Sequence, residues 1–284
     1  MTRAKAWRLL KTTVTAFIND EALGRGAAIA FYTVTSIAPV LLIVVAIAGM
    51  VFGREAAQNE IIAQLSGLIG QQSAELLQTA VASAQDKTSG KIATVIGVVM
   101  VIVTASGVFG EMQTALNVIW KAGPTGTPIS RLIRARAAGL GLVVSLGFLL
   151  MVSLAISAGL SAFGDYLNSV FAFGQVILTI VNGAVSLLLI SILFAAIYKV
   201  LPDKHIEWRD VIVGAIVTSF LFTAGKSLIG WYIGSSAVAS AYGAAGALIA
   251  MLLWVYYSAQ IFLLGAEFTK AYSDRAESDD VSKA

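Results

Sequence analysis

The chain alternates long uncharged stretches with shorter polar connections. The clearest uncharged stretch covers residues 27–53 and carries no charged side chain over its whole length. A helix rises about 1.5 Å per residue, so about 20 residues cross the roughly 30 Å hydrocarbon core of a bilayer. A helix in a soluble core would also carry a polar stripe, which this stretch lacks. The pattern therefore predicts a helix that spans a membrane.

A proline lies near the middle of this first span. Pro39 has no N–H group, and its ring frees the carbonyl of Thr35 one turn earlier. In lipid, such a carbonyl is tolerated only where protein, hydroxyl side chains or water can satisfy it. Thr33, Thr35 and Ser36 stand in the preceding turn. We therefore predict a kinked helix whose kink faces protein or a cavity, and we take Thr35, Ser36 and Pro39 as candidate cleft or gating residues.

Five further apolar stretches complete the predicted fold. We expect an all-α membrane protein, a six-transmembrane-helix bundle with a Pro-kinked first span. The expected membrane domain covers residues 27–268, with spans at about 27–51, 92–110, 137–160, 175–198, 211–233 and 246–268. No alternating pattern typical of β-barrel strands is present.

The connection between the first two spans has a helical period of its own. Ile61, Ile62, Leu65 and Ile69 share one face, and Gly70 interrupts the pattern. The sequence predicts two short amphipathic helices in the first outer loop, packed on the bundle or on the membrane surface.

The two ends of the chain are polar. Residues 1–26 combine basic side chains with Trp7, Leu10, Val14 and Phe17 at helical spacing, which predicts a basic amphipathic helix on an anionic inner leaflet. A solvated tail with some helix is the alternative interpretation. No cleavable signal peptide is expected, since the first apolar run is far too long. Residues 269–284 are expected to form a polar, disordered cytoplasmic tail.

Composition agrees with a membrane protein. The chain is 58% hydrophobic and 12% charged, whereas soluble domains carry about 25% charged residues. Cysteine is absent and His205 is the one histidine, which removes disulfides and the usual zinc sites. We expect no metal and no cofactor.

The positions of the basic residues predict the topology. Fifteen Lys and Arg side chains fall on the tails and on the connections after spans two and four, against three on the opposite side. By the positive-inside rule, both termini are expected to be cytoplasmic.

Four polar side chains inside or at the ends of spans are candidates for function, because a charge in lipid costs several kcal/mol. Lys226 lies about 22 Å along its span, toward the outer leaflet, where it either snorkels or faces a cavity. Glu111 and Glu267 stand at the inner ends of their spans, where each either pairs with a loop arginine such as Arg131 or Arg134 or couples to an ion. Gln260 lies two turns before Glu267 on nearly the same face, and it either lines a polar path or bridges helices.

Four sequence blocks carry a family resemblance. They are ALGRGAAIAFYTVTSIAPVLLIVVAIAG near the start, TALNVIW at 114–120, YKVLPDKHIEWRDVIVGA at 198–215 and AYGAAGALIAMLLWVYYSAQIFLLGAEF at 241–268. In this order they resemble the YihY/virulence factor BrkB family of bacterial inner-membrane proteins, whereas residues 125–197 match only in hydrophobicity. The resemblance implies six spans and an inner-membrane location. The family has no settled activity: it was once labelled ribonuclease BN, and members are linked to serum resistance and to envelope phenotypes.

The ribonuclease label does not fit the residues. A metal-dependent nuclease needs clustered histidines or carboxylates, and a metal-free one needs a paired acid and base. His205 stands in a loop beside Asp203 and Glu207, without a spacing typical of either. We expect no enzymatic activity and no nucleic-acid partner.

Two functional hypotheses follow. The first is a transporter or flippase-like translocator of an envelope lipid or glycolipid, based on the proline, the intramembrane polar groups and the implied phenotypes. The second is a non-transporting scaffold for envelope enzymes, based on small-residue helix faces and the basic tail. Membrane lipids are the expected partners. A homo-oligomer stays open, because no heptad or strong GxxxG pair supports one.

Overall fold

The computed structural model describes residues 3–69, 71, 74–75, 77–79, 107–123, 174–235 and 244–281. Every regular element within these ranges is a helix, which confirms the all-α class. The predicted span 137–160 and most of span 92–110 lie outside the described residues. The count of six spans therefore stays a prediction.

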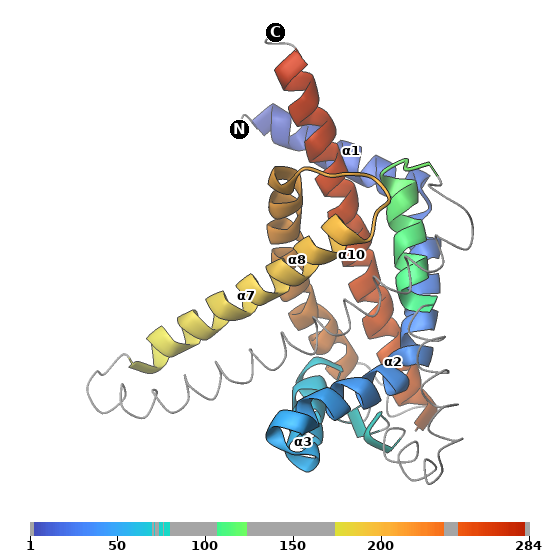
Figure 1. Ribbon diagram of the computed structural model, residues 1–284. Helices are drawn as coiled ribbons and strands as arrows, with labels where there is room; N and C mark the ends of the chain where they lie inside the picture. The colour runs from blue at the N-terminus through green and yellow to red at the C-terminus, as the bar shows by residue number, and fades with distance from the viewer. Residues whose placement is uncertain are drawn as a thin grey trace.

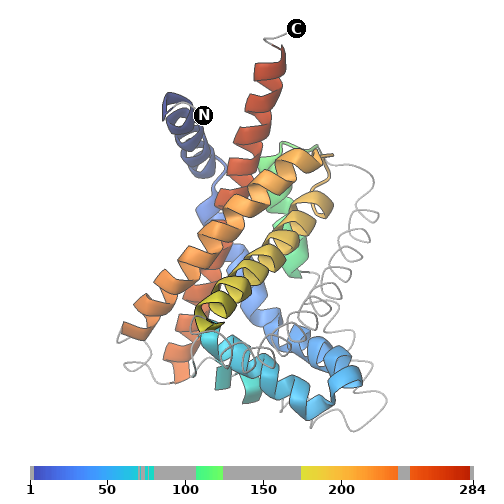
Figure 2. The same cartoon turned by 90° about the vertical axis from the view of Figure 1, so that its left-hand side faces the viewer.

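Three of the predicted spans are confirmed as helices that are long and apolar enough to cross a membrane. They are α7 (Gly174–Val200), α8 (Trp208–Ser235) and α10 (Ala244–Val281). The long helix α10 forms the centre, where it packs against α8 and α2, while α7 packs against α8 (Figures 1 and 2). In Figure 1 the start of α7 slants away from the other helices.

The first span begins earlier than the sequence pattern indicates. Helix α1 (Arg3–Asn19) confirms the predicted N-terminal helix, and α2 (Ala22–Phe52) starts five residues before residue 27. The chain turns at Glu21, whose backbone is left-handed with φ of 54°. The Arg25 side chain donates to the carbonyl of Asp20 at 3.0 Å, which satisfies a group at this turn.

Helix α2 continues through Pro39. The hydroxyls of Thr33, Thr35 and Ser36 each donate to a carbonyl one turn earlier, at 2.7 to 3.0 Å. The accepting carbonyls belong to Ile29, Phe31 and Tyr32. None of these three bonds therefore satisfies the carbonyl of Thr35, which the proline frees. The bend at Pro39 remains a prediction.

Glycines set the spacing between α8 and α10. At three levels a glycine on one helix meets a side chain of the other, so closely that an added Cβ would clash. The pairs are Gly214 with Thr269, Gly265 with Thr218, and Gly225 with Ile261. The numbers rise on α8 as they fall on α10, so the two helices run antiparallel in one fixed register. Such close approach through small residues is typical of helix packing in membranes.

Tyr198 anchors α7 to this pair. Its side chain is fully buried, and its hydroxyl donates to the carbonyl of Phe262 at 2.7 Å and lies 3.1 Å from the hydroxyl of Thr218. The rings of Phe194, Tyr198 and Phe262 stack on one another at 5.5 to 6.4 Å. A buried tyrosine needs a hydrogen-bond partner for its hydroxyl, and here α8 and α10 each supply one.

The expectation of a disordered tail after residue 268 was wrong over most of its length. Helix α10 continues to Val281, with Thr269 and Ala271 buried. The hydroxyl of Ser273 donates to the carboxylate of Asp210 at 2.6 Å. These contacts with α8 and α1 stabilise a helix that its polar composition alone does not indicate.

Helix α3 (Arg54–Ile69) covers the end of the bundle opposite the two termini. The predicted break at Gly70 lies outside the described residues. Ile61 and Leu77 are buried against Leu41, Val45 and Met251. This first connection therefore packs on α2 and α10, at the bottom of Figure 1.

Candidate functional site

The candidate site lies at the end of the bundle where α1 crosses α10, which is uppermost in Figure 1 and which we call the upper end. Its central residue is Glu267 of α10. This side chain is 0% exposed, and within the described part of the chain neither carboxylate oxygen makes a hydrogen bond of good geometry, although the carboxyl group of Asp20 lies close enough to share a proton with it. An unpaired buried carboxylate is costly, and its retention calls for an explanation.

Three other ionisable groups act on Glu267 electrostatically. They are the carboxylate of Asp20 at the α1–α2 turn and the ammonium groups of Lys270 on α10 and Lys121. Lys121 directly follows the helix over 107–119 and the turn residue Trp120. Segments from three distant parts of the sequence therefore bring charges of both signs around one buried carboxylate.

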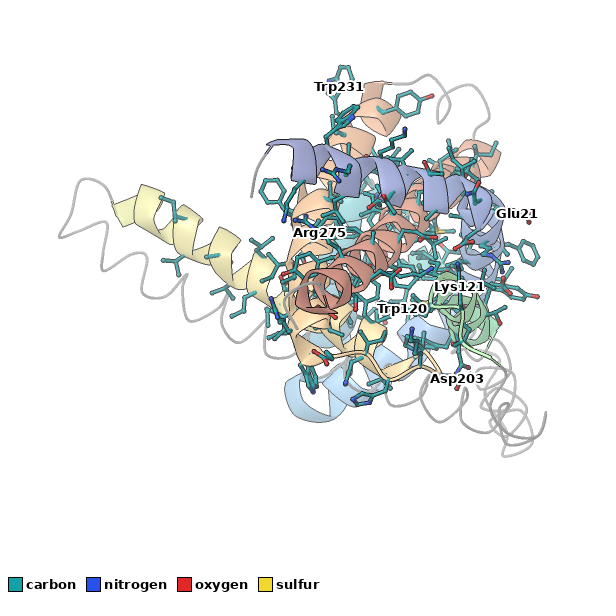
Figure 3. All side chains as sticks on the ribbon, turned by 90° about the horizontal axis from the view of Figure 1, so that it is seen from above. Glu21, Trp120, Lys121, Asp203, Trp231 and Arg275 are labelled. Atoms are coloured by element: carbon teal, nitrogen blue, oxygen red, sulfur yellow. The ribbon has the colours of Figure 1, made fainter. Side chains whose placement is uncertain are left out.

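Backbone strain is found at the same place. Glu21 and Lys121 are the described non-glycine residues with positive φ, at 54° and 48°. Both lie on the same side of α10 when the molecule is viewed from above (Figure 3). Such conformations cost about 1 to 3 kcal/mol each and occur preferentially at functional sites.

Gln260 lies seven residues before Glu267, so the two side chains leave nearly the same face of α10. Its Nε2 atom donates to the carbonyl of Leu23 on α2 at 3.4 Å, while its buried Oε1 atom has no partner among the described residues. Gly26 allows this approach, because an added Cβ there would lie 2.9 Å from Cδ of Gln260 and closer still to its amide nitrogen. Gln260 thus bridges α10 to α2.

The other candidates lie elsewhere. Lys226 is half-buried on α8 beside Gly225, which meets Tyr257, so it stands within about 5 Å of the depth of Gln260. Ser36 is buried and Thr35 exposed on α2, about 15 Å along that helix from Gly26.

The remaining acidic candidate, Glu111, is half-buried on the helix over 107–119. Its suggested partners Arg131 and Arg134 lie outside the described residues. Among these candidates, Gln260 and Glu267 lie on nearly the same face of α10, about 10 Å apart along the helix, and Thr35 and Ser36 lie at another level.

Two parts of the upper end were not predicted from the sequence. Asp20 was not singled out, although Asp20 and Glu21 are the only acidic residues of the first 53. Asp203 was considered only as a neighbour of His205, and it accepts a hydrogen bond from Asn117 at 2.8 Å. His205 is exposed in the same loop.

The comparisons with known proteins identify the family. The model of the family described as virulence factor BrkB matches residues 13–284. The chain belongs to this family. The resemblance of the four sequence blocks is thereby confirmed, and the chain is a membrane protein.

Curated relatives of the family carry the name UPF0761 membrane protein. One from Aggregatibacter aphrophilus is 28% identical over 273 residues, covering 94% of this chain and 93% of the relative. The relative named YihY, from Salmonella typhimurium, is 33% identical over 62% of this chain and 58% of its own. A third, from Alkalilimnicola ehrlichii, is 30% identical over 63% of this chain, and the match spans 39% of that relative's length. No solved structure matches.

Proposed function

We propose that this protein is a transporter or flippase-like translocator that moves a lipid or glycolipid of the bacterial envelope across the inner membrane. The observation that carries the proposal is Glu267, a fully buried carboxylate with no hydrogen bond of good geometry to the described residues, on a helix long and apolar enough to span a membrane. Ionisable groups inside membrane helices are rare and typically serve substrate, ion or proton pathways. No catalytic step, cofactor or nucleic acid is part of the proposal.

The groups around Glu267 support a coupling role. When its carboxylate binds a proton or a cation, the negative charge that Asp20 repels is neutralised. Lys270 and Lys121 then lose an attractive partner, so the contacts of the α1–α2 turn and of the segment after residue 119 change together. Such an exchange of contacts gives two states of the upper end, which alternating access requires. Gln260, two turns away on nearly the same face of α10, adds a polar contact to α2.

The proposed orientation places the upper end in the cytoplasm. Both termini lie at this end in Figures 1 and 2, which agrees with an even number of spans. The excess of Lys and Arg predicts the cytoplasm for the same end. Protons or cations would then reach Glu267 from the inner side of the membrane.

A liposome assay tests the proposal. Purified protein is reconstituted with a fluorescent phospholipid, and a membrane-impermeant reductant reports how fast the label changes leaflet. We expect the labelled phospholipid to change leaflet faster than in protein-free liposomes. The variant Glu267→Gln should lose most of this increase in rate. Glu207→Gln, in the exposed loop between α7 and α8, is the matched control and should behave as wild type. Equal rates of leaflet exchange with and without protein would contradict the proposal.

The second candidate function is a non-transporting scaffold for envelope enzymes. It is favoured by the tight packing of Gly26 against Gln260 and of Gly265 against Thr218, which indicates a rigid core. Crosslinking in cells discriminates the two: a scaffold should recover the same partner proteins repeatedly, and no consistent partner would count against it. A homo-oligomer is compatible with either function.

A further inference from the structure

Helix α1 carries an exposed apolar stripe beside its buried face. Leu9 and Thr13 are buried one turn apart, and Leu9 lies with Ala271 of α10 in the walls of a small pocket where the two helices cross. The stripe consists of four large apolar side chains, exposed by 45 to 69%, at three- and four-residue steps: Trp7, Leu10, Val14 and Ile18. Helix α1 therefore turns one face to α10 and leaves a second, apolar face largely uncovered.

A polar flank lies on the other side of the buried face. Successive residues of an α-helix are about 100° apart around its axis. Counted from the middle of the buried pair, the apolar stripe lies about 80 to 160° away in one direction, and the exposed Thr12 and Thr15 lie about 80 to 140° away in the other. The two exposed flanks of α1 are therefore of opposite character.

The arrangement of the helices decides which flank faces the membrane. In Figure 1, α1 runs from the N-terminus on the left to the right behind α10, and Figures 2 and 3 agree with this placement. The side chains of a right-handed helix advance clockwise when seen from its N-terminus. With the buried face turned toward α10, the apolar stripe therefore faces downward, the direction in which α8 and α10 extend as candidate spans, and the polar flank faces upward.

The depth of α1 agrees with a membrane surface. The apolar span within α10 covers Gly246–Ala276, and α1 crosses α10 at Ala271, close to the end of that span. The hydrogen bond between Asp210 of α8 and Ser273 of α10 places the start of α8 at the same level. Helix α1 therefore lies where two candidate spans end.

Exposed tryptophans near both ends of α8 mark the same level independently. Trp208 is 58% and Trp231 is 74% exposed. They are 23 residues apart, or about 34 Å along the helix, against roughly 30 Å for the hydrocarbon core of a bilayer. Tryptophan is enriched at both interfaces between a membrane and water. Trp208 lies two residues from Asp210, so the crossing of α1 and α10 is at the level of one such interface.

We propose that α1 is a membrane-surface helix, whose apolar stripe inserts into the acyl-chain boundary of the leaflet at the upper end. Its partner is the lipid of the same bilayer that the spans cross. A helix with one apolar face typically lies in the interface with that face about 5 to 10 Å deep. Ile18 lies two residues before Asp20, so insertion also holds the α1–α2 turn at a fixed depth beside Glu267. The inference requires neither translocation nor an anionic lipid.

Spin labelling of the full-length protein in phosphatidylcholine liposomes tests the inference. The chain has no cysteine, so Leu10→Cys and Val14→Cys each accept one nitroxide label. Thr15→Cys, exposed on the polar flank of the same helix, is the matched control. Relaxation of the label by lipid-soluble oxygen and by a water-soluble nickel chelate is compared. We expect the ratio of oxygen to nickel accessibility to be several-fold higher at Leu10→Cys and Val14→Cys than at Thr15→Cys.

The other outcomes overturn the inference. Equal ratios at Leu10→Cys, Val14→Cys and Thr15→Cys would mean that the apolar stripe faces water. Labels at Leu10→Cys and Val14→Cys that are protected from both reagents would mean that protein covers the stripe. Spectral broadening that disappears on dilution with unlabelled protein would identify that protein as a second copy of this chain. Either labelled variant alone is decisive where the other does not fold.

Discussion

The side-chain amide of Asn117 makes two hydrogen bonds with Asp203, one through its nitrogen and one through its oxygen. The Nδ2 atom of Asn117 donates to the carboxylate of Asp203 at 2.8 Å, and the backbone N–H of Asp203 donates to Oδ1 of Asn117 at 2.8 Å. The two residues lie 86 positions apart, on the helix over 107–119 and on the loop between α7 and α8. Gln113 adds a weaker bond of 3.4 Å to the same carboxylate. The pair therefore fastens the α7–α8 loop to a separate helix at the upper end.

The first prediction concerns this pair. Asn117→Asp should lower the free energy of unfolding by about 1 to 3 kcal/mol, since a carboxylate cannot donate to Asp203 and repels it. The amide of Asn117 both donates to the carboxylate and accepts from the backbone N–H, whereas an ionised carboxylate can only accept. Thermal unfolding of the purified protein in detergent measures the change.

Thr114→Ala is the control for this prediction. Thr114 lies on the same helix, is exposed, and donates only to the carbonyl of Gly110 one turn earlier. It should change stability by less than about 0.5 kcal/mol. If Asn117→Asp unfolds at the same temperature as Thr114→Ala, the pair does not fasten the loop.

The second prediction concerns the α8–α10 register. Gly265→Ala places a Cβ against the hydroxyls of Thr218 and Tyr198, and the Tyr198 oxygen would lie 2.7 Å away. Neither side chain can easily move aside, because both are fully buried and the hydroxyl of Tyr198 donates to the carbonyl of Phe262. We expect a loss of about 1 to 3 kcal/mol, typical of overpacking, measured by thermal unfolding.

Gly183→Ala on α7 is the matched control, because no heavy atom lies within 4 Å of its added Cβ. Alanine favours a helix over glycine by about 1 kcal/mol, so this variant should be neutral or more stable. A loss of stability in both variants would assign the effect to helix glycines in general and refute the close approach at Gly265.

Three of the predicted spans agree with the structure because a long apolar run is a local property of the sequence. The helices α7, α8 and α10 agree with the predicted spans 175–198, 211–233 and 246–268 at their starts within a few residues. The end of α10 was missed, since its helix after residue 268 depends on contacts such as Ser273 with Asp210. Those contacts join residues 63 positions apart.

The candidate site was predictable only in part, for the same reason. Gln260 and Glu267 share a face by their spacing alone, which the structure bears out in the position of both on α10. Asp20 and Lys121 approach Glu267 only through the tertiary fold. On α1, periodicity assigned Phe17 to the outer apolar face, whereas Phe17 packs against the core and Ile18 is exposed instead.

The third prediction concerns the left-handed backbone of Lys121. The N–H groups of Lys121 and Ala122 bond the carbonyls of Val118 and Asn117, so Lys121 occupies the position of a helix end that glycine prefers. Lys121→Gly should therefore unfold at a higher temperature than Lys121→Ala, by about 1 kcal/mol in stability. Both variants remove the ammonium group near Glu267, so their difference isolates the backbone. Equal stabilities of Lys121→Gly and Lys121→Ala would contradict backbone strain at this position.

The fourth prediction separates a functional from a structural role of Glu267. Glu267 is buried with no hydrogen bond of good geometry to the described residues, which destabilises the fold, so Glu267→Gln should unfold at the same temperature as wild type or higher. The same variant should slow lipid movement in liposomes. Stability that rises as activity falls is typical of residues retained for function.

Asp210→Asn is the matched control for Glu267→Gln, since Asp210 is also buried but accepts a hydrogen bond from Ser273 at 2.6 Å. Loss of its charge weakens that bond and should lower stability by about 1 kcal/mol. A comparable loss in Glu267→Gln would mean that Lys270 and Lys121 hold Glu267 as a structural ion pair. Its burial would then be explained by packing at the upper end, and the coupling role would have to be sought at Lys226 or Gln260.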